Sequence, residues 1–249
     1  MFKKFILLMI FFTTLVYSKT INIAVAANVS YAIDTLKKEF NKQYPNIKLR
    51  VTLGSSGKLT AQIKNGAPYD IFMSANMKYP NSLYKKNLAI TKPIVYAQGS
   101  LAILSNKQRS FKKGIDILKS KLVKRIAIAN PKTAPYGKAT FEALKNKGIL
   151  DEVKNKIIYG ESISQTVSYS IMAADVGIIA MSSLYSKKMK RFKKNLHYKQ
   201  IDKNLYTPID QGIVILKDPK DKKSAKAFYD FILSKKAKDI LKNYGYLIP

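Results

Sequence analysis

The sequence predicts an α/β protein built from two lobes. Short apolar runs alternate with amphipathic segments along almost the whole chain, a pattern typical of parallel strands connected by helices. The series stops and restarts near the middle of the chain, and four of its strands lead directly into short polar loops that open a helix. A chain of 249 residues is long enough to form two hydrophobic cores.

The first α/β series occupies the N-terminal part of the chain. Its strands are expected at 21–26, 47–53 and 70–74, and its helices at 31–44, around 59–63 and around 83–87. Ile33, Leu36 and Phe40 recur at helical spacing on one face of the first helix, and Pro45 follows its end. This βαβαβ order implies a parallel sheet with helices on its faces.

The second series begins near residue 100. Its strands are expected at 100–104, 126–129, 157–159, 177–180 and 213–216, and its helices at 137–147, 165–173 and 224–244, the last of these as one or two closing helices. We expect the chain to cross between the lobes near 96–100 and again near 206–211, and the closing helices to pack on the first lobe. Two crossings form a hinge, which lets two lobes close over a ligand.

The N-terminus predicts a signal peptide at residues 1–18. Lys3 and Lys4 precede an apolar stretch at 5–16, and small residues then offer a cleavage site after Ser18. An uncleaved membrane anchor is the alternative, but the apolar stretch is short for a membrane span. The mature chain divides into a discontinuous lobe at 19–97 and 207–249 and a second lobe at 98–206. Because the chain contains no Cys, it has no site for lipid attachment, and we expect a free periplasmic protein.

The net charge of +30 would attract nucleic acid or an anionic surface. The lysines are spread along the chain, however, and the densest cluster, at 187–194, is typical of a solvated surface. We therefore expect no nucleic-acid partner, and we keep a basic, polyanion-binding protein only as an alternative.

The residue types argue against an enzyme. His197 is the only histidine, and without Cys the chain lacks the usual zinc ligands. No serine has an evident base beside it in the sequence. We expect no catalytic residues, no bound metal cation and no cofactor.

The four loops predict an anion site instead. They lie at 26–30 (AANVS), 54–57 (GSSG), 134–137 (APYG) and 160–164 (GESIS). Backbone N–H groups at a helix start have no partner inside the helix, and the helix dipole places partial positive charge there. Taken singly, each loop is equally a helix cap, but four loops at the carboxyl ends of strands in two lobes would meet in one cleft.

The donors in these loops indicate which anion fits. They are the hydroxyl and N–H groups of Ser55 and Ser56, the amide and N–H of Asn28, the phenol and N–H of Tyr136, and the N–H of Ile163. A fully deprotonated oxyanion only accepts hydrogen bonds, whereas a protonated one such as hydrogen phosphate needs an acceptor. Glu161 is the one acid in the loops, and we expect it to face solvent, which favours molybdate, tungstate or sulfate over phosphate.

The sequence resembles the periplasmic molybdate-binding proteins of ABC importers over essentially the whole mature chain. The segments that carry the resemblance are AANVS at 26–30, GSSGKLTAQIKNGAPYDIFMSAN at 54–76, ANPKTAPYG at 129–137, VGIIAMS at 176–182 and GYLIP at 245–249. The resemblance implies the two-lobed type II periplasmic-binding-protein fold, with a hinge of two crossovers and the ligand in the interlobe cleft. It also implies capture of molybdate, usually tungstate too, without a cofactor, and delivery to a permease in the inner membrane. We expect a monomer, because that is the natural form for a protein that must dock on a transporter.

The family's oxyanion ligands fall on Asn28, Ser56, Tyr136 and Ile163 of this sequence. Asn28 stands where the family often has Ser or Thr. Ala180 stands where some members place a Tyr, and the phenol of Tyr136 is a candidate to replace it. A binding protein for sulfate or phosphate remains the alternative.

Overall fold

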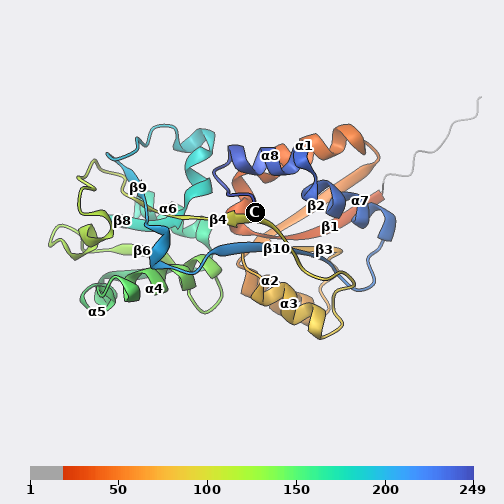
Figure 1. Ribbon diagram of the computed structural model, residues 1–249, viewed down its shortest axis with the longest axis horizontal. Coiled ribbons are helices and arrows are strands. Elements are labelled where there is room, and N and C mark those ends of the chain that lie inside the picture. The colour runs from red at the N-terminus through yellow and green to blue at the C-terminus, as the bar shows by residue number, and fades with distance from the viewer. Residues whose placement is uncertain (1–18) are drawn as a thin grey trace, which may run out of the picture.

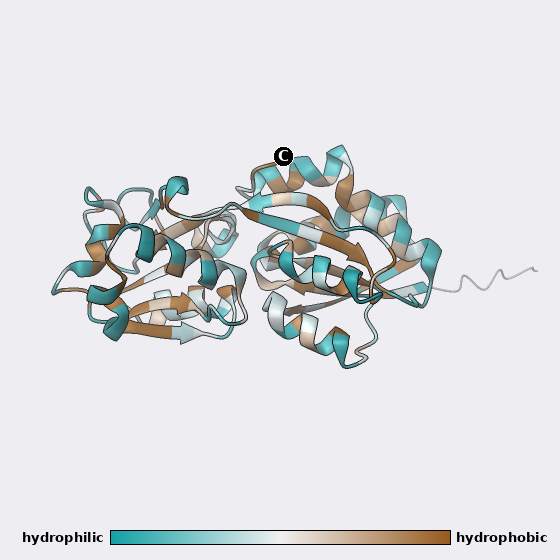
Figure 2. Ribbon diagram, turned by 60° about the horizontal axis from the view of Figure 1, so that its bottom comes forward, coloured by the Kyte–Doolittle hydropathy of each residue, from teal (hydrophilic) through white to brown (hydrophobic). Residues whose placement is uncertain are grey.

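A computed structural model describes residues 19–249; the signal peptide predicted at 1–18, with cleavage after Ser18, lies outside the described residues. Two five-stranded sheets, each covered by helices, form two lobes that lie side by side (Figure 1). Apolar strands fill the interior of each lobe, and polar stretches lie on the helices and loops around them (Figure 2). None of the described helices has the length and hydropathy needed to cross a membrane.

The first lobe is built on the sheet with strand order β2-β1-β3-β10-β4. Its strands are β1 (Lys19–Ala26), β2 (Ile47–Gly54), β3 (Ile71–Ser74), β4 (Ile94–Gly99) and β10 (Ile209–Ile215). β1 pairs in parallel with β2 and β3, but β10 is antiparallel to both β3 and β4. The parallel pairing predicted for the three strands of the first series is therefore confirmed, and the sheet as a whole is mixed because β10, which returns from the second lobe, runs antiparallel to its neighbours.

Helices cover both faces of the first sheet (Figure 1). They are α1 (Ile33–Gln43), α2 (Ser56–Lys64), α3 (Lys78–Lys85), α7 (Lys222–Leu233) and α8 (Lys235–Asn243). The closing helices pack against α1, where the Phe40 ring lies 5.2 Å from Phe228 and 5.5 Å from Phe231. The prediction that these helices return to the first lobe is confirmed.

The second lobe is built on the sheet with strand order β7-β6-β8-β5-β9. Its strands are β5 (Leu101–Leu104), β6 (Ile126–Ala129), β7 (Ile157–Gly160), β8 (Val176–Ala180) and β9 (Tyr198–Gln200), and its α-helices are α4 (Pro135–Asn146), α5 (Leu150–Val153) and α6 (Ile163–Met172). β6 pairs in parallel with β7 and β8, whereas β5 is antiparallel to β8 and β9. This sheet is mixed as well.

The chain crosses between the two sheets twice. It leaves β4 for β5 through Ser100, and it returns from β9 to β10 through 201–208. β4 and β10 pair side by side, with Ile209 opposite Gly99 and a register shift between Gln211 and Gly212. The two predicted crossings are confirmed, while the lobe limits at 19–97, 98–206 and 207–249 stay a prediction.

Candidate functional site

All four predicted loops meet in one small space between the lobes, which we call the interlobe cavity. Its lining residues are Ala26, Ala27, Asn28, Gly54, Ser55, Ser56, Ala75, Ala134, Pro135, Tyr136 and Ile163. The strands β1, β2, β6 and β7 end at the loops that provide these residues or lead to them. The structure therefore brings together the four residues that the sequence singled out.

The four residues lie at the starts of helices. Ser56 and Ile163 are the first residues of α2 and α6, and Tyr136 is the second residue of α4. Asn28 is the second residue of a 3-10 helix at Ala27–Tyr31. Backbone N–H groups at these positions lack partners within their helices, and the positive ends of the helix dipoles add to their effect. Four unpaired N–H groups around one cavity make a ready anion site.

Contacts between the lobes close this cavity. The backbone N of Gly57 donates to Thr133 O at 2.9 Å, and Ser164 Oγ donates to Ala27 O at 2.8 Å. The first contact requires glycine, because a Cβ on Gly57 would lie 2.8 Å from that carbonyl oxygen. The volume of the interlobe cavity is about 10 Å³. A site of this size suits a small, compact anion.

The cavity has no charged lining residue. Lys58 and Glu161 form an ion pair of 2.6 Å between the lobes, with 53% and 66% of their side chains exposed. Glu161 thus faces solvent, as the sequence predicted. An anion site without a carboxylate suits a guest that carries no proton, because such a guest only accepts hydrogen bonds.

Two serine hydroxyls have a hydrogen left to donate. Ser56 Oγ accepts from Ala75 N at 2.9 Å, which leaves its own hydrogen free. Ser55 occupies the N-cap position of α2 but makes no capping bond, and its buried Oγ has no partner among the described residues. Both side chains belong to the cavity lining.

The Tyr136 phenol is also available as a neutral donor. Its ring is buried, and burial, with a smaller contribution from Tyr246, raises the pKa of the phenol well above its usual value of 10. Gln211 Nε2 donates to Tyr136 Oη at 3.2 Å. Because that bond uses a lone pair of the phenol oxygen, the hydroxyl hydrogen is left for another acceptor.

The Asn28 side chain differs from expectation. Its Nδ2 donates to Gln211 Oε1 and to Tyr246 Oη, both at 2.8 Å, so neither amide hydrogen remains for a ligand. Its Oδ1 is buried and has no donor among the described residues. In this structure Asn28 can donate only its backbone N–H to a ligand, because both side-chain hydrogens are donated to Gln211 and Tyr246.

Gln211 and Tyr246, which the sequence did not single out, contact the cavity residue Asn28 from behind the cavity lining. Both are buried, and together they surround the Asn28 amide. Gln211 lies in β10 between Asp210 and the apolar half of the strand, and Tyr246 belongs to the GYLIP segment at 245–249. A polar residue beside the apolar run at 213–216 is the one signal in the sequence that could have found Gln211.

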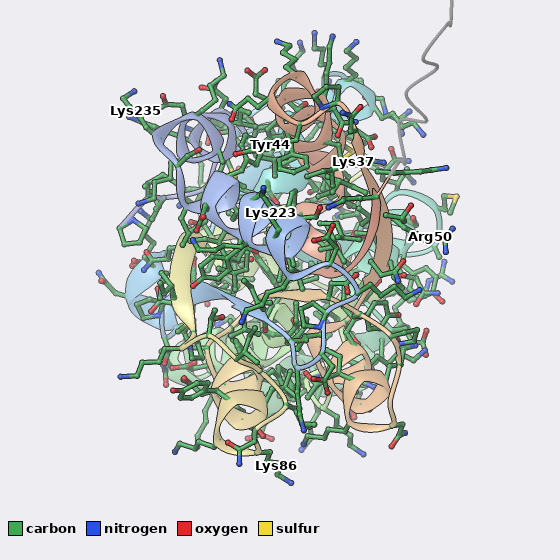
Figure 3. All side chains as sticks on the ribbon, turned by 90° about the vertical axis from the view of Figure 1, so that its right-hand side faces the viewer. Lys37, Tyr44, Arg50, Lys86, Lys223 and Lys235 are labelled. Atoms are coloured by element: carbon green, nitrogen blue, oxygen red, sulfur yellow. The ribbon has the colours of Figure 1, made fainter. Side chains whose placement is uncertain are left out.

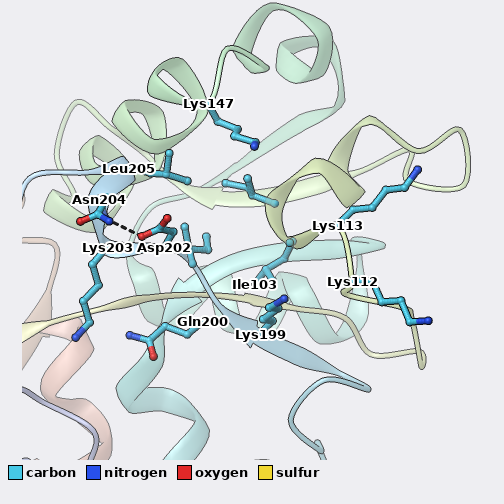
Figure 4. A pocket seen from close by; sticks show the side chains of 13 residues that line it. Ile103, Lys112, Lys113, Lys147, Lys199, Gln200, Asp202, Lys203, Asn204 and Leu205 are labelled. Carbon is cyan, nitrogen blue, oxygen red and sulfur yellow. Dashed lines mark hydrogen bonds between the residues drawn. The ribbon is translucent and has the colours of Figure 1, made fainter.

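A larger hollow lies on the second lobe (Figure 4), and it shares no lining residue with the interlobe cavity. It has a volume of about 700 Å³, and its cationic lining residues are Lys112, Lys113, Lys147, Lys199 and Lys203. Lys147 pairs with Asp116 at 3.2 Å, and Lys199 Nζ donates to Phe111 O at 3.2 Å. These lysines therefore do not converge on one point, and none of them lines the interlobe cavity.

The rest of the described chain offers no competing metal centre. No group of three or more His, Asp or Glu residues within 19–249 is arranged to hold a metal ion. Asp70 is buried and accepts from Asn22 N at 2.6 Å and from Lys220 N at 2.7 Å. Both of its carboxylate oxygens are therefore used within the fold, and Asp70 has a structural role.

Comparison with known proteins gives a consistent result. The family model for bacterial extracellular solute-binding proteins matches residues 21–247. The molybdate-binding protein ModA of Azotobacter vinelandii is 32% identical over 228 residues, which cover 91% of this chain and 89% of that protein. ModA of Rhodobacter capsulatus is also 32% identical, over 90% of this chain and 86% of that protein.

Solved structures show the same likeness. The periplasmic molybdate-binding protein of Azotobacter vinelandii superposes with a TM-score of 0.85 over 92% of this chain and 99% of that chain. The sulfate-binding protein SubI of Mycobacterium tuberculosis, at 13% identity and a TM-score of 0.72, shares the fold alone. Similarity in sequence and in structure thus coincides for the molybdate-binding relative.

Proposed function

The chain belongs to the family of bacterial extracellular solute-binding proteins, and we propose that it captures molybdate for an ABC importer. The two ModA relatives at 32% identity support this assignment over nine tenths of the chain. The observation that carries the proposal is the meeting of four helix starts on one uncharged cavity. Molybdate is a proton-free dianion, and such a site offers it donors without a competing carboxylate.

We assign each of the four residues the role of a neutral donor. Asn28, Ser56, Tyr136 and Ile163 offer backbone N–H groups, and Ser56 and Tyr136 add hydroxyls. Ser55 is a further candidate, because its hydroxyl is buried at the cavity without a partner. A hydrogen bond to a charged acceptor contributes about 1.5–3 kcal/mol, so six or seven of them offset the cost of dehydrating the ion and closing the lobes.

Selectivity in this proposal follows from size. Mo–O and W–O bonds are longer than S–O bonds, so donors held at a spacing suited to molybdate meet sulfate oxygens at poorer distances. The donors are backbone groups or buried side chains, and the closed lobes hold them at fixed separations. We therefore expect tungstate to bind as well as molybdate, and sulfate to bind far more weakly.

We further propose that the protein works in the periplasm as a monomer. Export would be followed by cleavage after Ser18, and the absence of Cys leaves no lipid anchor. The permease in the inner membrane would receive the ion when the lobes open. Mass spectrometry of the exported protein tests the first step, and a mature chain that does not begin at Lys19 contradicts it.

Calorimetry at neutral pH decides the ligand. Molybdate, tungstate, sulfate and phosphate are titrated in turn into the mature protein. We expect heat and saturation with molybdate and tungstate. Tight binding of sulfate or phosphate, with no heat from molybdate, would overturn the assignment in favour of another oxyanion.

A further inference from the structure

Gln211 stands at the junction between the two lobes. It lies in β10, directly before the register shift with β4 and shortly after the chain returns from the second lobe. Its side chain is fully buried. A buried amide has four hydrogen-bonding positions to satisfy, so its partners fix its orientation.

The amide of Gln211 connects a ligand loop of each lobe. Its Oε1 accepts from Asn28 Nδ2 of the first lobe at 2.8 Å, and its Nε2 donates to Tyr136 Oη of the second lobe at 3.2 Å. Tyr96 Oη donates to the same Oε1 at 3.4 Å. One side chain on the hinge therefore touches the Asn28 and Tyr136 side chains at once.

These hydrogen bonds form a network in which the donor and acceptor of each bond are defined. Tyr246 Oη donates to Asn28 O at 2.9 Å, so it accepts from Asn28 Nδ2. The second hydrogen of Nδ2 requires an acceptor, which holds Gln211 with its Oε1 toward Asn28 and its Nε2 toward Tyr136. At the end of this network the Tyr136 hydroxyl oxygen accepts a hydrogen bond from Gln211, so the hydroxyl hydrogen must point away from Gln211. A reversed Gln211 amide would instead accept that hydrogen and remove the donor from the site.

The backbone makes room for this arrangement at Gly99. A Cβ at this position would collide with Tyr136 Oη and would lie 2.8 Å from Gln211 Nε2. Gly99 lies opposite Ile209 on the neighbouring hinge strand. The contact between Gln211 and Tyr136 thus depends on the pairing of the two strands that connect the lobes.

We propose that Gln211 is a positioning residue that turns the Tyr136 hydroxyl hydrogen toward the bound anion when the lobes are closed. The proposal rests on the anion site described above. Because the contact joins residues of different lobes, it aligns the donor in the closed state, where the anion is enclosed. Gln211 itself does not line the cavity, so its effect on affinity passes through Tyr136.

A double-mutant cycle measures this coupling. Affinity for molybdate is determined by calorimetry for the wild type, Gln211→Ala, Tyr136→Phe and the double variant. We expect Gln211→Ala to weaken binding about tenfold in the wild type and by less than about twofold when Tyr136 is already Phe, because coupled residues are non-additive. The matched control is Gln98→Ala, which removes an amide bonded to Asp210 on the same strand pair and should leave affinity unchanged.

Gln211→Glu provides a second test with nearly the same side-chain volume. Its carboxylate keeps the acceptor for Asn28 but would accept the Tyr136 hydrogen, so binding should weaken at least as much as in Gln211→Ala. Equal losses for Gln211→Ala in both backgrounds, or wild-type affinity in Gln211→Ala and Gln211→Glu, would overturn the proposal. If the wild type binds another of the four anions instead of molybdate, the proposed function fails, and the same cycle with that anion still tests Gln211.

Discussion

For individual residues, the property that matters at the interlobe cavity is which hydrogen each polar group has left to donate. Ser56 and Tyr136 each accept one bond from the protein, which leaves the hydroxyl hydrogen free. Asn28 has already donated both of its amide hydrogens within the fold. Residue type thus names a possible donor, whereas the bonds made within the fold decide whether the hydrogen is available to an anion.

Replacing Ser55 should lower the affinity for molybdate without lowering the stability of the fold. Its buried hydroxyl has no partner, so Ser55→Ala removes an unsatisfied group and should leave the melting temperature unchanged or raised. The same change should weaken molybdate binding about tenfold, by the loss of one bond to a charged acceptor. Thermal unfolding of the ligand-free protein and calorimetry measure the two effects.

Ser224→Ala is the matched control for that experiment. Ser224 is also buried in the first lobe, but its Oγ donates to Asp221 Oδ2 at 3.0 Å. This variant should lose stability and keep its affinity. A Ser55→Ala protein that behaves in the same way would assign Ser55 a purely structural role.

Affinity should be insensitive to pH in the neutral and mildly alkaline range. No cavity-lining residue is charged, and burial raises the pKa of Tyr136 well above 10. A raised pKa keeps the phenol protonated as pH increases, so the donor is retained between about pH 7 and 9. Calorimetry at several pH values checks this, and a steep change over the range would indicate a titrating group in the site.

Among the secondary-structure elements, the helix starts contribute most to the site. α2, α4 and α6 begin at the cavity, and their first N–H groups are left unpaired by helix geometry. Their positive dipole ends come from both lobes, so closure adds their effects at one point. The proposed anion site can therefore consist of neutral groups, because the helices fix the direction of their N–H bonds.

Ile163→Pro tests one of these N–H groups in isolation. Ile163 is the first residue of α6, a position that proline accepts, and Ser162 before it already has the extended conformation that proline favours, with φ −138° and ψ 165°. The change removes the N–H donor while the helix is kept. We expect a loss of about 1.5–3 kcal/mol in binding free energy, measured by calorimetry.

Ile163→Ala is the comparison for this variant. Ile163 is buried, so either substitution removes packing, but alanine keeps the N–H group. The Ile163→Ala variant should therefore bind molybdate much more tightly than the Ile163→Pro variant. Equal affinities for the two variants would show that the N–H group of residue 163 does not bind the anion.

For the molecule as a whole, the high positive charge and the anion site are separate features. The labelled Lys37, Lys86 and Lys235 lie on different sides of the first lobe in Figure 3. The second lobe adds the lysine-lined hollow (Figure 4), none of whose lining residues belongs to the interlobe cavity. In our proposal, binding at the interlobe cavity depends on buried neutral donors, whereas binding to a polyanion would depend on exposed charge.

The salt dependence of affinity distinguishes these two modes. A protein that binds a polyanion through six to ten phosphate contacts loses about 10³–10⁵ in affinity between 50 and 200 mM salt. Molybdate bound by buried neutral donors should change by less than about tenfold over this interval, because buried interactions are little screened. A steeper loss would favour the basic surface as the functional part of the protein.

The fold class and the four loops could be predicted because their signals are local. Alternating apolar runs and amphipathic segments lie within a few residues of one another, and a helix start leaves N–H groups unpaired whatever surrounds it. The same locality explains why β4 was missed as a strand. Residues 94–99 form β4 by pairing with β10, more than a hundred residues later.

The sequence was sufficient to name Asn28, Ser56, Tyr136 and Ile163 as neighbours of one cavity, because each follows a strand whose carboxyl end faces the cleft. The sequence was not sufficient to predict which hydrogen-bond partner each side-chain hydrogen of those residues has. Asn28 lies 183 residues from Gln211 and 218 from Tyr246, and Tyr136 lies 75 from Gln211. Which partner takes each hydrogen depends on the antiparallel entry of β10 and on its pairing with β4, and strand pairing of this kind is established only when distant segments pack together.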